Sequence, residues 1–159
     1  MMEIRRANAK DIPQLLRLLS QVLEIHAKIR PDIFVSGTTK YSEEDLRLMV
    51  ANDSNPIYVI GEGEKVYGYA FCQSRIPKFA STMKRKKTFH IDDFCIDEAC
   101  RGKHLGQALF AFLIEEGKRL GYDEITLNSW EGNEAANAFY EKMGMKTRSR
   151  IMDLPLTKE

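Results

Sequence analysis

The sequence has few cysteines, no long apolar run and almost no net charge. Its three cysteines lack a C-x-x-C spacing, which predicts free thiols in a reducing cytosol. No apolar run approaches the length of a membrane-spanning helix, and the N-terminus lacks the pattern of a signal peptide. A net charge of +1 provides no global attraction for nucleic acid or for a membrane. These absences favour a cytoplasmic globular protein with neither kind of partner.

The order of predicted elements indicates one mixed α/β domain over residues 1–159. Strands are expected at 3–7, 56–60, 66–72, 88–96 and 124–128, with one or two more in 146–154. Helices are expected at 11–28, 42–50, 105–120 and 133–142. The turn at 62–64 predicts an antiparallel hairpin between the second and third strands. We find no internal repeat or linker that would divide the chain.

The most informative stretch runs from a strand into the start of a helix, over residues 91–109. Its loop carries Arg101, Gly102, Lys103 and Gly106. A helix N-terminus presents unpaired N–H groups and a partial positive charge, and glycine lets main chain approach a phosphate closely. Both the P-loop pattern and G-x-G-x-x-G are absent. The stretch therefore predicts an anion site, although an ordinary solvated loop is the alternative.

Two segments resemble signatures of the GNAT superfamily of N-acetyltransferases. Residues 101–106 resemble its pyrophosphate loop, Q/R-x-x-G-x-G/A, with His104 in place of the middle glycine. His104 would therefore have to adopt backbone angles that glycine adopts easily. The second signature, N-x-x-A-x-x-F-Y-E-K-x-G, is matched at Asn133, Ala136, Phe139, Tyr140, Glu141, Lys142 and Gly144. The order of elements agrees over nearly the whole chain, and Asp92 is similar to a carboxylate of the spermidine/spermine-type members.

The resemblance implies a mostly antiparallel central sheet flanked by about four helices, with a cleft between the two central strands. It implies acetyl-CoA as cosubstrate and no metal. Main-chain groups of Phe94, Cys95 and Ile96 would pair with the pantetheine arm, and Asn133 would bind the same arm. The pyrophosphate would lie on Arg101, Gly102, Lys103, His104, Leu105, Gly106, Gln107 and Ala108.

The implied reaction is direct attack of a primary amine on the thioester, without an acyl-enzyme. Asp92 would be the base, directly or through a water, because an aspartate is one methylene shorter than the usual glutamate. Strand alternation sends Asp92 and Asp93 to opposite faces. Tyr140 would be the general acid, since a phenol can protonate a departing thiolate. The alternatives are a structural carboxylate at Asp92 and a packed aromatic at Tyr140.

The resemblance implies an acceptor amine that belongs to a small molecule or to a peptide. Asp32 and Phe34 lie in the loop where family members shape the acceptor pocket, and Trp130 follows a strand end. Trp130 could instead simply pack. The resemblance also allows a homodimer. The alternative function is that of an acyl-CoA-binding regulatory module with little turnover.

Overall fold

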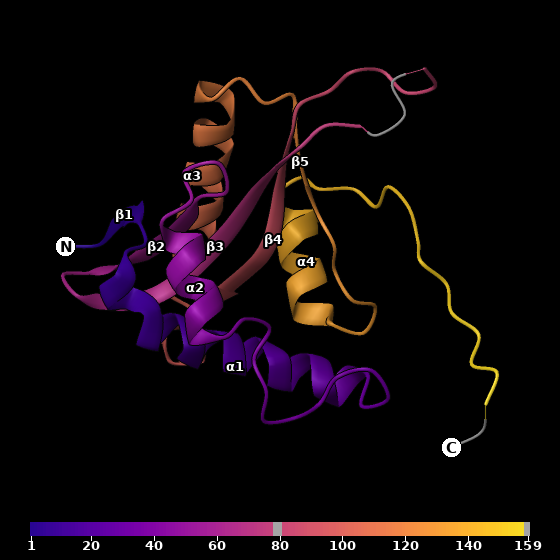
Figure 1. The fold of residues 1–159 in the computed structure, drawn as a ribbon, viewed down its shortest axis with the longest axis horizontal. Coiled ribbons are helices and arrows are strands. Elements are labelled where there is room, and N and C mark those ends of the chain that lie inside the picture. The colour runs from indigo at the N-terminus through magenta and orange to yellow at the C-terminus, as the bar shows by residue number, and fades with distance from the viewer. Residues whose placement is uncertain (78–80, 158–159) are drawn as a thin grey trace.

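The computed structural model describes residues 1–77 and 81–157. Within them, five strands form one sheet in the order β1–β2–β3–β4–β5, namely β1 (Glu3–Arg6), β2 (Ile57–Glu62), β3 (Lys65–Arg75), β4 (Thr88–Ile96) and β5 (Glu124–Leu127). Neighbouring strands are antiparallel except β4 and β5, which are parallel. The α-helices of these residues are α1 (Ile12–Ile29), α2 (Glu43–Val50), α3 (Leu105–Arg119) and α4 (Glu134–Lys142). The predicted mixed α/β fold class is confirmed (Figure 1).

The helices cover opposite faces of the sheet. Alternate residues of β3 divide between two apolar clusters: Tyr69 and Phe71 join the cluster of α1 and α2, while Ala70 and Cys72 join that of α3. Because successive side chains of a strand point to opposite faces, α1 and α2 lie on one face and α3 on the other. The site described below lies on β4, whose side chains belong to the apolar clusters on both faces of the sheet.

The helix ends follow the local sequence signals. Ser42 and Asp45 form a capping box at the start of α2, with the Asp45 N–H donating to Ser42 Oγ at 3.0 Å and the Ser42 N–H donating to Asp45 Oδ2 at 2.9 Å. Gly121 and Gly144 follow α3 and α4 with φ of 79° and 99°, angles that glycine adopts without steric cost.

Helix α1 begins at Ile12, one residue after the predicted start at 11. Asp11 precedes the helix but makes no side-chain cap bond. Its carboxylate instead accepts a bidentate ion pair from Arg5, at 2.8 and 2.9 Å, and the N–H of Asn8 at 2.8 Å. The Asn8 side chain caps a short 3₁₀ turn, Ala9–Asp11, that precedes α1.

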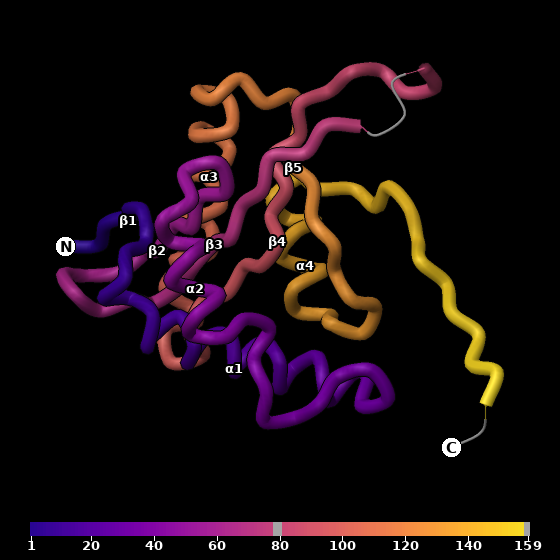
Figure 2. Tube along the Cα trace, viewed as in Figure 1, coloured from indigo at the N-terminus to yellow at the C-terminus, as the bar shows by residue number. Residues whose placement is uncertain are grey.

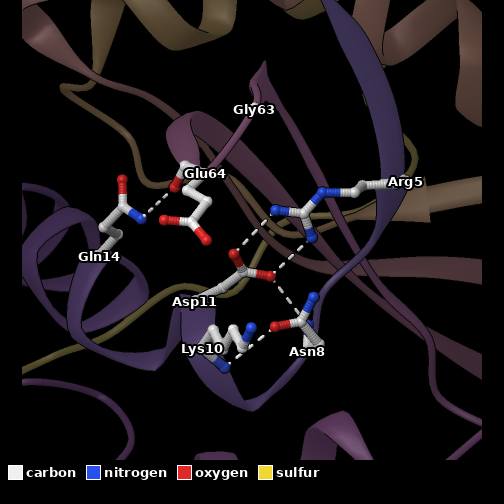
Figure 3. Close-up of a pocket in the computed structure, with 7 residues that line it drawn as sticks. All are labelled: Arg5, Asn8, Lys10, Asp11, Gln14, Gly63 and Glu64. Atoms are coloured by element: carbon white, nitrogen blue, oxygen red, sulfur yellow. Dashed lines mark hydrogen bonds and ion pairs between the residues drawn. The ribbon is translucent and has the colours of Figure 1, made fainter.

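A hollow of about 380 Å³ lies beside this start of α1, and Figure 3 shows the side chains that line it. Its polar groups bond to one another: Asp11 to Arg5 and Asn8, and Gln14 Nε2 to the Glu64 carbonyl at 2.7 Å. Gln14 Oε1 also accepts the Val66 N–H at 2.7 Å. These bonds join α1 to β1 and to the β2–β3 hairpin, and they occupy the side chains of Arg5, Asp11 and Gln14.

The predicted strands at 146–154 are wrong, because residues 146–156 form no strand or helix. The segment runs outside the body of the molecule, as the yellow trace in Figures 1 and 2 shows. Arg148 ties its start to Glu124 of β5 at 2.8 Å, but a strand needs a ladder partner along its length. Ile151, Met152, Leu154 and Leu156 are left 81–96% exposed.

Candidate active site

The loop before α3 adopts the geometry that the glycine replacement required. His104, the residue before the helix, lies in the left-handed region with φ 60° and ψ 22°. Gly102 is also left-handed, with φ 82°. The Ala108 N–H bonds to the His104 carbonyl at 3.2 Å, and the N–H groups of the preceding first turn have no intrahelical partner. Those donors, beside the exposed Arg101 and Lys103, can bind an anion.

Gly106 has a packing role that sequence reasoning missed. A Cβ at this position would lie 3.3 Å from two ring carbons of Phe139, closer than ordinary contact. The glycine therefore lets α4 approach the first turn of α3. Whatever the helix N-terminus binds is thus close to the helix that carries Tyr140.

The edge of β4 that faces away from β3 is only half occupied. β5 pairs with β4 from Thr88 to Ile91 and no further, whereas β3 pairs with β4 as far as Ile96. The last five residues of β4, 92–96, therefore have no β5 partner on that edge. An open strand edge of this kind can pair with an extended ligand. Phe94, Cys95 and Ile96, expected to bind the pantetheine arm, lie on it.

A β-bulge at Asp92 corrects the expectation that Asp92 and Asp93 face opposite ways. Phe71 pairs with Asp93 and the next β3 residue, Cys72, pairs with Ile91, so Asp92 is an extra residue with no partner opposite. A bulge rotates the strand locally and re-aims its side chains. Lys40 consequently lies within reach of both carboxylates, 3.3 Å from Asp92 Oδ1 and 3.9 Å from Asp93 Oδ2.

Two tyrosines complete this carboxylate cluster. The Tyr41 hydroxyl donates to Asp92 Oδ2, and the Tyr69 hydroxyl donates to Asp93 Oδ1 at 3.1 Å. Burial raises the pKa of Asp93 to about 6, while the Lys40 ammonium acts in the opposite direction. A carboxyl that titrates so near neutrality can exchange a proton with a bound group.

Sequence reasoning missed Lys40, Tyr41 and Tyr69 as members of this cluster. Tyr69 could have been found from the predicted hairpin, since its strand alternation places it on one face with Phe71. Lys40 and Tyr41 belong to the irregular segment before α2, and no periodicity indicates where such a segment lies.

Tyr140 lies on α4 against the open part of β4. Its ring centroid is 6.3 Å from that of Phe94 and 5.6 Å from that of Phe139. Burial raises the pKa of Tyr140, and the nearby Asp93 and Cys95 act in the same direction, so the phenol keeps its proton at neutral pH. No hydrogen bond to its hydroxyl is formed within the described residues. Asn133 directly precedes α4 and makes no side-chain cap bond.

The three residues predicted for the acceptor separate into two groups. Phe34 and Trp130 meet edge to face with ring centroids 5.0 Å apart, and His26 packs 5.1 Å from Phe34. Asp32 instead forms a bidentate pair with Arg30, at 2.9 and 2.7 Å, which lowers the pKa of its carboxyl. The aromatic cluster is available to line a pocket, whereas Asp32 is held by Arg30, which also binds Asp153 at 2.7 Å.

The described residues contain neither a metal-binding group nor a membrane span. No set of three or more His, Cys, Asp or Glu side chains within 1–77 and 81–157 is placed to hold a metal ion. No helix in the same part of the chain has the length and apolar character needed to cross a bilayer. The three cysteines are buried and unpaired.

Comparison with known proteins agrees with the two sequence signatures. The sequence model of the Acetyltransferase (GNAT) family matches residues 19–145. Glucosamine 6-phosphate N-acetyltransferases of Trypanosoma brucei brucei and Arabidopsis thaliana are each 36% identical, over 80 and 63 residues. These alignments cover 50% and 40% of this chain, and the chain spans 51% and 40% of the two relatives.

Solved structures extend the similarity to the whole fold. A mutant of the BH1408 protein from Bacillus halodurans superposes with a TM-score of 0.92 at 33% identity, over 98% of this chain and 99% of that one. The glucosamine-6-phosphate N-acetyltransferase of Arabidopsis thaliana has the same fold, with a TM-score of 0.69 at 24% identity over 99% of both chains.

Proposed function

Because this chain belongs to the GNAT family of acetyltransferases, we propose that it transfers an acetyl group from acetyl-CoA, the family's cosubstrate, to the primary amine of a small molecule. One observation carries the proposal. The β4 edge that β5 leaves open begins at a bulge bearing two carboxylates and runs toward the N-terminus of α3.

The chain offers matching groups for each part of acetyl-CoA. Main-chain donors of the loop and first turn at 101–108 would hold the pyrophosphate, helped by Arg101 and Lys103. Main-chain groups of Phe94, Cys95 and Ile96 would pair with the extended arm, and the Asn133 side chain would bind it from the start of α4. The left-handed His104 and the open strand edge support this assignment.

Two side chains would move protons. When bound, acetyl-CoA supplies a thioester that is already reactive toward an amine. An ordinary alkylamine has a pKa near 10.4, so removing its proton at pH 7 costs about 4–5 kcal/mol. Asp92 would accept that proton, directly or through a water, with Asp93 beside it. Tyr140 would donate its proton to the departing sulfur, and the free, protonated state of its hydroxyl supports this role.

The environment of the cysteines supports direct attack without an acyl-enzyme. Cys95 is the thiol on the open half of β4, and it is 7% exposed. Burial raises its pKa to about 12, so almost none of it is thiolate at neutral pH. Because the thiolate is the nucleophilic form, Cys95 is unsuited to carry the acetyl group.

The acceptor that we propose is a small molecule with a primary ammonium group. The Asp92 and Asp93 carboxylates favour a cation at the bulge, and the acceptor of the two named relatives is an amino sugar phosphate. Similarity to these relatives favours an amino sugar phosphate as the acceptor. Asp92 alone, which is similar to a carboxylate of the spermidine/spermine-type members, would favour a polyamine.

An acceptor screen tests the function. Purified protein, acetyl-CoA and single amines, including glucosamine 6-phosphate, glucosamine and spermidine, are followed by thiol release. We expect release that depends on one class of amine and saturates with its concentration. Tight CoA binding with no amine-dependent release across the panel would contradict the proposal and identify an acyl-CoA-binding module.

We also propose that the chain forms a homodimer through its C-terminal segment. Four apolar side chains between 151 and 156 are exposed, and the outer edge of β5 is unpaired in the described residues. Strand addition from a second copy would cover both. The double variant Ile151→Asp, Leu154→Asp should be monomeric by light scattering, whereas Ser149→Asp should remain dimeric. A monomeric parent protein would contradict this proposal.

A further inference from the structure

The Lys40 ammonium occupies the position where the bulge would receive an amine. Its Nζ lies 3.1 Å from the main-chain carbonyl oxygen of Asp92, 3.3 Å from Asp92 Oδ1 and 3.9 Å from Asp93 Oδ2. The two carboxylate side chains are 14% and 9% exposed, while that of Lys40 is 44% exposed. A flexible, half-exposed lysine thus places a primary amine among largely buried acceptor oxygens.

The position of this contact along β4 matters. Asp92 is the first β4 residue without a β5 partner, so a ligand arm paired with Phe94, Cys95 and Ile96 would end beside it. Resting on the proposed function, we infer that Lys40 is a self-acetylation site, because its tethered amine lies where the acceptor amine of the reaction would lie.

The reaction balances without a further reagent. Asp92 takes a proton from the Lys40 ammonium, and the freed nitrogen lone pair attacks the thioester carbonyl carbon. A C–N bond forms and the C–S bond breaks, with its electrons leaving on sulfur. The nitrogen loses a second proton as the amide forms, and sulfur takes up one proton to become the free thiol of CoA. Asp92 then releases the first proton to solvent, so one proton is released overall. The Lys40 side chain becomes a neutral amide. Its positive charge is lost, and the two carboxylates at the bulge are left without that cation.

Mass spectrometry of the intact protein and its peptides tests the modification. Protein is incubated with acetyl-CoA whose acetyl group is deuterated, without an acceptor. We expect label at Lys40 at least tenfold faster than at Lys65, an exposed lysine on the β2–β3 hairpin. The rate constant should be independent of protein concentration, and Asp92→Asn should slow labelling at Lys40 about tenfold or more while leaving Lys65 unchanged. Equal labelling of the two lysines would overturn the inference.

A second measurement needs no acetyl-CoA. The Asp93 carboxyl carbon is titrated by NMR in the parent protein and in Lys40→Met and Lys40→Arg. Since the Lys40 charge opposes the burial-induced rise in the pKa of Asp93, Lys40→Met should raise that pKa further and Lys40→Arg should not. An unchanged Asp93 titration in Lys40→Met would show that the lysine is not at the bulge in solution, and would overturn the inference.

The two proposals fail in different ways. Amine-dependent thiol release with no label on Lys40 would overturn self-acetylation and leave the acetyltransferase function intact. Absence of both thiol release and CoA binding would overturn the function and, with it, the self-acetylation that depends on it.

Discussion

Replacing Tyr140 with phenylalanine removes one proton donor and leaves the ring in place. The ring contacts with Phe94 and Phe139, at centroid distances of 6.3 and 5.6 Å, do not involve the hydroxyl. That hydroxyl makes no hydrogen bond within the described residues, so no partner loses a bond. We therefore expect the free energy of unfolding to change by less than about 1 kcal/mol.

The rate of acetyl transfer should respond far more strongly. Loss of a general acid typically costs 10²–10⁴-fold in rate. A thiolate is a tolerable leaving group, so we expect the lower end, about 100-fold, which corresponds to about 2.7 kcal/mol in the barrier. The assay is single-turnover formation of product with enzyme in excess, where product release does not limit the rate. Calorimetry should give the same CoA affinity for both proteins.

Tyr122→Phe is the matched control. Tyr122 stacks on Phe89 with ring centroids 4.7 Å apart, near the start of β4 and three residues before the bulge at Asp92. This variant should turn over at the parent rate. A Tyr140→Phe enzyme with near-normal single-turnover rate would refute the assignment and reduce Tyr140 to a packed aromatic that leaves the thiolate to solvent.

Three further predictions follow from the same geometry. Gly106→Pro removes a main-chain donor and should weaken CoA binding at least tenfold by calorimetry. Gly106→Ala keeps the donor and only crowds Phe139, so it should weaken CoA binding less. Equal losses of affinity would mean that the glycine acts through helix packing and not through its N–H. Phe34→Ala should change relative kcat/KM among acceptors severalfold and CoA affinity by less than twofold, and the reverse pattern would show that this loop does not serve the acceptor. For Asp93, the folded pKa of about 6 exceeds the ordinary value of 3.8, so the folded state binds more protons between these values and loses stability as pH rises. The free energy of unfolding of the parent relative to Asp93→Asn should therefore fall by on the order of 2 kcal/mol from pH 4 to pH 7, and a flat difference would contradict the burial of this carboxyl.

Local signals predicted the elements that depend on neighbouring residues. The strand at 88–96 was predicted with the bounds that the structure has, and the helix from Leu105 was predicted to end one residue beyond its observed end at Arg119. Alternation, a helix-start loop and a following glycine all agree there. The two matching signatures lie at the start of α3 and on α4. The structure brings these two helices together through Gly106 and Phe139.

Features that depend on tertiary pairing could not be predicted. A bulge at Asp92 depends on the register in which β3 and β4 pair. The sequence of one strand indicates only how its side chains alternate between the two faces. The approach of Lys40 to that bulge depends on the path of an irregular loop. The C-terminal segment has the composition of a strand, yet a strand forms only where an edge is available to pair with it.

The most direct test of the account is whether an amide product forms at the bulge. A limiting amount of acetyl-CoA with a deuterated acetyl group is mixed with excess enzyme and the best amine of the acceptor screen. The reaction is quenched at successive times, and both the small molecules and the protein are examined by mass spectrometry. The account predicts that the N-acetylated amine appears in a single phase, with no acetyl group on any cysteine at any time, and that Asp92→Asn slows this phase. Acetylated amine that forms only after an acetylated cysteine, or no N-acetyl product from any amine while CoA remains bound, would contradict it.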